Sequence, residues 1–94
     1  REQVENYLYK LTYELLIGVV REKAAGMSVR EEDMDFIATV YQYAFVGLML
    51  DWIKNDMKGE PEVIVDRLAQ VMHGNVTAAL ERLRIDKAPS NSPE

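Results

Sequence analysis

The sequence predicts an all-α protein built as a bundle of three to four helices. Apolar residues recur three and four positions apart along most of the 94 residues, and no segment alternates apolar and polar residues as a strand does. Glycines and a proline, at Gly26, Gly59 and Pro61, separate the periodic segments. A chain of this length holds one domain at most. We place that domain at residues 1–86 and expect a disordered polar tail at residues 87–94, where the sequence is rich in Pro and Ser.

The first helix is expected from about Gln3 to Ala25. Its apolar residues form two adjacent stripes, as in a helix that is covered over a wide face inside a bundle. Gly26 follows, and glycine accepts the left-handed backbone that ends many helices. The first stripe holds Val4, Leu8, Leu11 and Leu15, and the second holds Tyr9, Tyr13, Leu16 and Val20.

The second helix is expected from about Val29 to Asn55. Ser28 and Glu31 have the spacing of a capping box, in which each side chain bonds the other residue's backbone amide. The acidic residues that follow suit the positive end of the helix dipole. They lack the ligand order and the central glycine of a calcium loop.

The middle of the second helix is uncharged from Phe36 to Leu50. This run is shorter than the roughly 20 apolar residues of a membrane span, so we interpret it as a buried helix and predict no membrane partner. Gly47 lies in mid-helix, where glycine costs up to about 1 kcal/mol relative to alanine. Close approach of another helix over Gly47 would compensate for that cost.

The third helix is expected to start at Pro61, because proline is favoured in the first helical turn. Apolar spacing continues beyond Met72, so a single long helix is one interpretation. The residues from His73 to Asn75 favour a break instead, with Asn75 capping a short fourth helix from about Val76 to Arg84.

Composition and charge exclude several functions. Eleven basic against sixteen acidic residues give a net charge of −5, which disfavours DNA binding by this chain alone. There is no cysteine, and His73 is the single histidine, so we predict no metal site and no cofactor. No serine has a plausible base partner, so we predict no catalytic residue and no enzyme. The lack of cysteine is compatible with a cytoplasmic location.

The tyrosines and methionines allow two interpretations. Tyrosine offers an apolar ring with one hydrogen-bonding group, and methionine adapts to irregular ligands. A small-molecule pocket lined by these residues is one hypothesis, and ordinary core or interface packing is the favoured alternative. The candidate pocket residues are Tyr9, Tyr13, Tyr41 and Tyr43, with Met49 beside them.

Two adjacent segments resemble the C-terminal region of TetR-family transcriptional regulators. "YAFVGLMLDWIKNDM" is a long apolar helix with Gly47 and Trp52, and "KGEPEVIVDRLAQVM" is an amphipathic helix opened by Pro61. The resemblance covers residues 36–72 well and most of the chain loosely. It implies that these two helices pair with those of a second copy as a four-helix bundle, which would cover the surplus apolar surface.

The resemblance also implies partners and functional residues. The chain would form a homodimer, bind a small apolar effector, and reach DNA only through an N-terminal helix-turn-helix that these 94 residues lack. Two alternatives are a helical adaptor that grips a partner helix and, more weakly, a small enzyme with buried carboxylates. The residues predicted for the dimer seam are Phe45, Gly47, Leu48, Met49, Trp52, Val65, Leu68 and Met72.

Overall fold

Four α-helices make up the computed structural model, which describes residues 2–86. They are α1 (Glu2–Lys23), α2 (Glu31–Lys54), α3 (Pro61–Met72) and α4 (Asn75–Leu83). No strand occurs within residues 2–86, so the all-α prediction is confirmed. The tail predicted at residues 87–94 lies outside the described residues.

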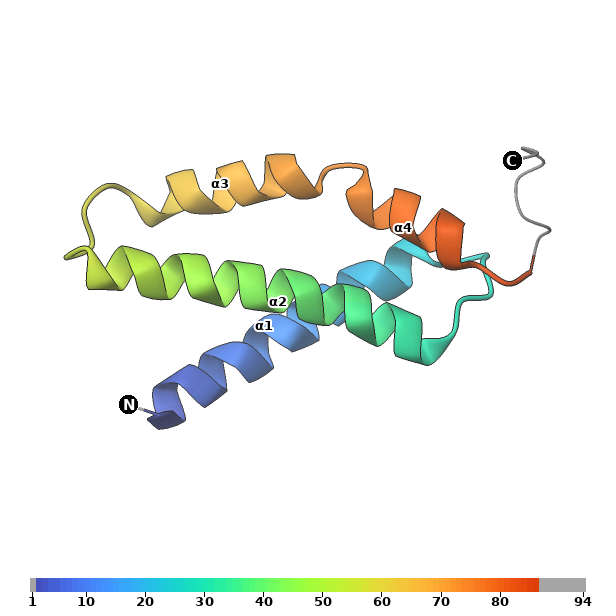
Figure 1. The fold of residues 1–94 in the computed structure, drawn as a ribbon, viewed down its shortest axis with the longest axis horizontal. Coiled ribbons are helices and arrows are strands. Elements are labelled where there is room, and N and C mark those ends of the chain that lie inside the picture. Colours follow the sequence, from blue (N-terminus) through green and yellow to red (C-terminus); the bar gives the residue numbers. More distant parts are fainter. Residues whose placement is uncertain (1, 87–94) are drawn as a thin grey trace.

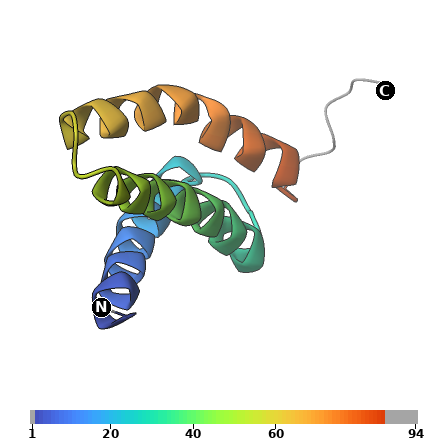
Figure 2. The same cartoon turned by 60° about the vertical axis from the view of Figure 1, so that its left-hand side comes forward.

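The four helices form an elongated bundle around α2. α3 and α4 follow one another along one side of α2 and run in the opposite direction to it, while α1 crosses the other side at an angle (Figure 1). Turned by 60°, the first half of α1 still diverges from the other helices (Figure 2). The molecule measures 50 × 25 × 20 Å, so much of each helix is near the surface.

The core lies where the second half of α1, the first half of α2 and α4 meet. α4 contributes the largest fully buried side chain, Leu80, at 0% exposure. α3 contributes no buried residue to this core. The buried cluster consists of Ile17, Val20 and Ala24 of α1, Ile37 and Ala38 of α2, and Val76 and Leu80 of α4.

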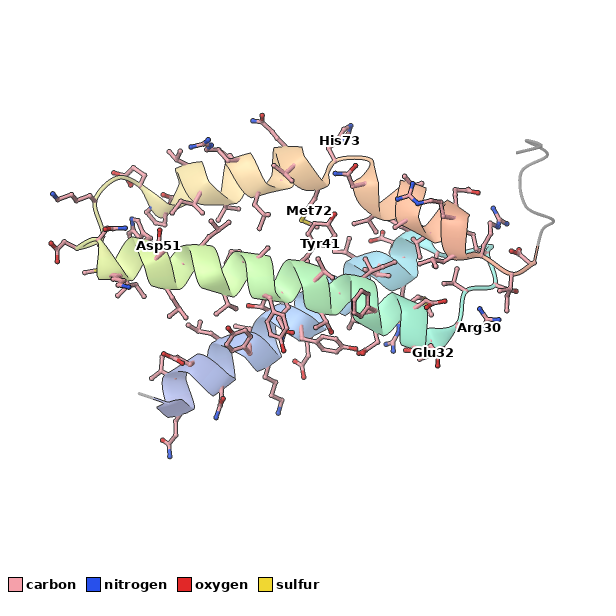
Figure 3. The ribbon with its side chains drawn as sticks, viewed as in Figure 1. Arg30, Glu32, Tyr41, Asp51, Met72 and His73 are labelled. Carbon is pink, nitrogen blue, oxygen red and sulfur yellow. The ribbon has the colours of Figure 1, made fainter. Side chains whose placement is uncertain are left out.

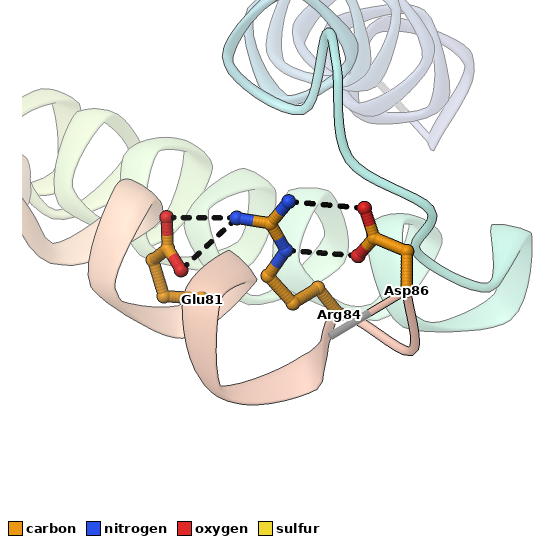
Figure 4. A network of polar contacts seen from close by, with 3 residues as sticks. All are labelled: Glu81, Arg84 and Asp86. Atoms are coloured by element: carbon orange, nitrogen blue, oxygen red, sulfur yellow. Dashed lines mark hydrogen bonds and ion pairs between the residues drawn. The ribbon is translucent and has the colours of Figure 1, made fainter. Parts of the chain in front are cut away.

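Polar contacts after α4 fasten the end of the described chain to the α1–α2 turn. The backbone amide of Ile85 donates to the carbonyl oxygen of Ser28 at 2.8 Å. Arg84 donates two hydrogen bonds to the Asp86 carboxylate, at 2.8 and 3.0 Å, and also contacts Glu81 (Figure 4). These contacts hold α4 over the core.

The predicted capping box is wrong. α2 starts at Glu31, its N-cap residue is Arg30, and no side chain caps it. The Glu31 carboxylate instead pairs with Arg21 of α1. A tertiary ion pair has therefore replaced the local cap that the spacing predicted.

The predicted break between the last two helices is confirmed. Gly74 has the left-handed φ of +78° at the junction, which a residue with a side chain would adopt at a cost. Gly74, and not Asn75, is the N-cap of α4. The Asn75 side-chain amide instead donates backwards to the carbonyl oxygen of Val71.

Within one subunit, the prediction that α2 is a buried helix holds at only three positions, and cover of the rest by a second copy stays a prediction. Only Ile37, Ala38 and Val46 of this helix are buried within the described chain. α2 is also the one described helix that is long and apolar enough to cross a membrane, by length and composition only, a test that core helices of soluble proteins also pass. One subunit therefore leaves an unusually apolar helix half covered.

Candidate functional site

Two apolar surfaces lie beside the contacts that α2 makes with α3 and α4, and they meet at Leu68. We call the first the outer face. It contains two open depressions of about 410 Å³ each. The outer face comprises Phe36, Val40 and Leu48 of α2, Ile64, Arg67 and Val71 of α3, and Ala79, Arg82 and Leu83 of α4.

The outer face is strongly exposed in the single subunit. Phe36 is 68% exposed and Val71 is 63% exposed, although both are large apolar residues. Gly47 is exposed too, and its position seven residues after Val40 puts it on the same side of α2. A Cβ atom added at Gly47 would meet nothing within 4 Å among the described residues, so none of the four helices closes over it.

The second surface is a groove that we call the inner groove. It lies between α1 and α3, with α2 at its base, and has a volume of about 220 Å³. Met72 points from α3 toward α2 in Figure 3. The groove is lined by Thr12, Leu15 and Leu16 of α1, Phe45 of α2, and Val65, Leu68, Ala69 and Met72 of α3.

The structure divides the residues predicted for the dimer seam among four places. Gly47 and Leu48 lie on the side of α2 that carries the outer face. Trp52 closes the α2–α3 turn, where its indole N–H donates to the carbonyl oxygen of Gly59 at 3.1 Å. Met49 is half-buried on α2. Phe45, Val65 and Met72 line the inner groove, and Leu68 lines both surfaces.

The four candidate tyrosines are not gathered around one cavity. The rings of Tyr9 and Tyr43 meet edge to face with centroids 5.6 Å apart. Tyr13 donates a hydrogen bond to Asp35, which raises the pKa of Tyr13. Tyr41 lines the outer-face depression beside Phe36 and packs against the core. Three of the tyrosines therefore sit on the α1–α2 contact, and Tyr41 sits on the other side of α2.

Polar contacts fix α1 against α2 next to these tyrosines. The Gln42 side-chain amide donates to the backbone carbonyl of Tyr9 at 2.7 Å. Arg21 pairs with Glu31, and this contact raises the pKa of Arg21. α1 and α2 are therefore held together by polar contacts as well as packing. α3 is attached to this pair mainly through apolar contacts and the turns at its two ends.

The described residues 2–86 present surfaces that are suited to binding. No group of three His, Cys, Asp or Glu side chains there is arranged to hold a metal ion. His73, the C-cap residue of α3, is exposed. Both surfaces are lined mainly by apolar side chains. Polar groups are contributed by Arg67 and Arg82 on the outer face and by Thr12 in the inner groove.

A family model described as a transcriptional regulator C-terminal region matches residues 1–74. The chain belongs to this TetR-type family. The match ends at Gly74, so α4 lies beyond the matched part although it supplies Val76 and Leu80 to the core. No curated protein matches the chain, and no solved structure matches it.

Membership of the TetR-type family confirms the resemblance inferred from the two quoted segments. Sequence reasoning nevertheless missed several residues of the two surfaces. Phe36 and Val40 precede the quoted segment, and their exposure depends on which side of α2 is turned away from α1. Val71 and Thr12 carry no sequence signal that separates them from core residues.

Proposed function

We propose that the chain is the dimerisation and effector-binding domain of a TetR-type transcriptional regulator. DNA binding would be performed by a helix-turn-helix domain outside these 94 residues. Family membership supports the regulator class, and the net charge of −5 agrees with a domain that does not itself hold DNA. The observation that carries the dimer proposal is the outer face.

The outer face has the make-up of an interface between copies. Its centre is apolar and spans three consecutive helices, while Arg67 and Arg82 add charge. Neither arginine forms an ion pair within residues 2–86, so both are available to a partner. A large exposed apolar surface with charged residues around it marks an interaction site in soluble proteins.

A second copy is the partner that fits this face best. α2 and α3 run antiparallel along it, so a two-fold axis would set two such pairs against one another as a four-helix bundle. Gly47 would allow the two copies of α2 to approach closely, because no atom of residues 2–86 fills that space. We keep Gly47 and Leu48 in the proposed seam and add Phe36, Val40 and Val71.

We assign effector binding to the inner groove and signalling to α3. The groove is bounded by α1 and α3, and α3 also carries the proposed seam on its other side. A ligand between α1 and α3 would change the position of α3, and with it the relative tilt of two subunits. The spacing of two DNA-binding domains would change in turn.

Spin labels test both the existence and the location of the dimer. The chain has no cysteine, so Asp51→Cys and Val4→Cys each introduce a single labelling site. Asp51 is exposed and lies one helical turn after Gly47 on the same side of α2, so a label there borders the proposed close approach without filling it. We expect pulsed dipolar spectroscopy to give a short inter-label distance at position 51 and a longer one at position 4, on the diverging end of α1. No inter-label coupling at position 51, or a shorter distance at position 4, would contradict the proposed seam.

A chain that stays monomeric would favour the helical adaptor, which would use the outer face for a different protein. The proposal also includes a cytoplasmic location and no catalytic role, in keeping with a transcriptional regulator domain.

A further inference from the structure

Thr12 is a polar side chain in a groove that is otherwise hydrocarbon. The other seven lining residues are Leu, Phe, Val, Ala and Met. Thr12 is only 7% exposed. Its hydroxyl makes no hydrogen bond within residues 2–86, yet no described side-chain polar atom is both sealed from solvent and without a partner. The accessible part of Thr12 therefore faces the groove, with a hydrogen-bonding group to offer.

The size of the inner groove restricts what it can hold. Its volume of about 220 Å³ is below the roughly 300–1,000 Å³ of pockets for drug-sized ligands. It is larger than the engineered apolar cavity of about 150 Å³ that binds benzene. A ligand with one ring and a short substituent matches this range.

The charge of the lining restricts the ligand further. No acidic or basic residue of the described chain lines the groove. An ionised group held against Leu16 and Phe45 would lose part of its hydration and find no charged partner in the groove, at a free-energy cost. An uncharged ligand avoids that cost, and one oxygen atom would satisfy the Thr12 hydroxyl.

We infer that the inner groove binds a neutral single-ring compound that carries one hydroxyl or carbonyl oxygen, and that Thr12 is the residue that selects it. This inference rests on the proposed role of the groove as the effector site. The ring lies among the apolar side chains of α1, α2 and α3, and the oxygen forms a hydrogen bond with the Thr12 hydroxyl. A hydrocarbon of the same shape leaves Thr12 without a partner and binds more weakly.

A matched pair of probes tests this selectivity: 4-ethylphenol and 4-ethyltoluene, which differ by a hydroxyl in place of a methyl group. Titrations followed by methyl NMR locate the site through Leu15, Leu16, Leu68 and Met72. We expect both probes to shift these methyl signals, with 4-ethylphenol binding about two- to tenfold more tightly, the ratio that one net hydrogen bond provides.

Three variants complete the test. Thr12→Val keeps the side-chain shape and removes the hydroxyl, so it should abolish the preference for 4-ethylphenol. Thr77→Val is the control, because Thr77 is exposed on α4, outside the groove, and the preference should persist. Ala69→Leu extends a side chain into the groove from α3 and should weaken binding of both probes.

Two results would overturn the inference. One is an absence of groove methyl shifts with either probe, and the other is a preference for 4-ethylphenol that survives in Thr12→Val. Sedimentation of the same samples separates this failure from that of the dimer proposal: a dimer that binds neither probe refutes the ligand class alone, whereas a monomer that binds 4-ethylphenol refutes the dimer alone.

Discussion

The indole N–H of Trp52 donates a hydrogen bond to the carbonyl oxygen of Gly59, 3.1 Å away across the turn between α2 and α3. Gly59 has a left-handed backbone, with φ +81°, and directs its carbonyl back toward the end of α2. Trp52 therefore has a role within its own subunit, in closing the turn that sets α3 against α2.

Replacing Trp52 with phenylalanine should separate this role from dimerisation. Trp52→Phe keeps an aromatic ring and loses the N–H group, so we expect the free energy of unfolding to fall by about 1 kcal/mol. Urea denaturation measures that loss, and sedimentation equilibrium should show an unchanged dimer. Weakened association with undiminished stability would instead place Trp52 in the seam.

α4 should be essential for stability although it lies beyond the family match. Leu80 is fully buried in the α1–α2–α4 cluster, so Leu80→Ala should lower the free energy of unfolding by about 2–5 kcal/mol. Leu83, on the same helix and 37% exposed, provides the control: Leu83→Ala should cost much less. Chemical denaturation with circular dichroism compares the two, and equal losses would show that α4 is not anchored by Leu80.

The contact of Arg84 with Asp86 should make stability depend on pH in the acid range. The Arg84 guanidinium, and next the Ser28 backbone amide, hold the pKa of Asp86 well below its ordinary value near 3.8. Because the folded-state pKa is the lower one, this stabilisation is present above about pH 4 and is lost as the pH falls further. Asp86→Asn should thus be less stable than the unmodified chain near neutrality.

The free energies of unfolding of the unmodified chain and of Asp86→Asn should converge as the pH falls. Urea titrations from neutral pH down to about pH 2 would follow the difference between their free energies of unfolding, which should shrink as Asp86 becomes protonated. A difference that stays constant over this range would mean that the Asp86 charge does not stabilise the fold.

The sequence predicted the helices and the family because both depend on local or repeated signals. Pro61, Gly59 and Gly74 mark boundaries through backbone preferences that hold in any fold. The capping box failed because α2 starts at Glu31, two residues later than expected, and the Glu31 carboxylate pairs with Arg21 of the preceding helix. A contact between side chains of two different helices cannot be predicted from the spacing of residues within one of them.

The seam was harder to predict for a geometric reason. α2 is apolar around nearly its whole circumference, so periodicity could not indicate which side packs against α1, which against α3 and which is left uncovered. Phe45 and Leu48 looked equivalent in sequence, yet Phe45 lines the inner groove and Leu48 lies on the outer face. That difference follows from the crossing of α1 over α2.

A single substitution on the outer face tests the proposed dimer most directly. Val71 and Val4 are both valines of similar exposure, at 63% and 61%, but Val71 belongs to the outer face and Val4 to the diverging end of α1. Val71→Lys should convert the dimer to a monomer in sedimentation equilibrium while helix content stays unchanged, because a cation is tolerated in the last turn of α3. Val4→Lys should remain dimeric. A Val71→Lys protein that associates as strongly as the unmodified chain would contradict the account.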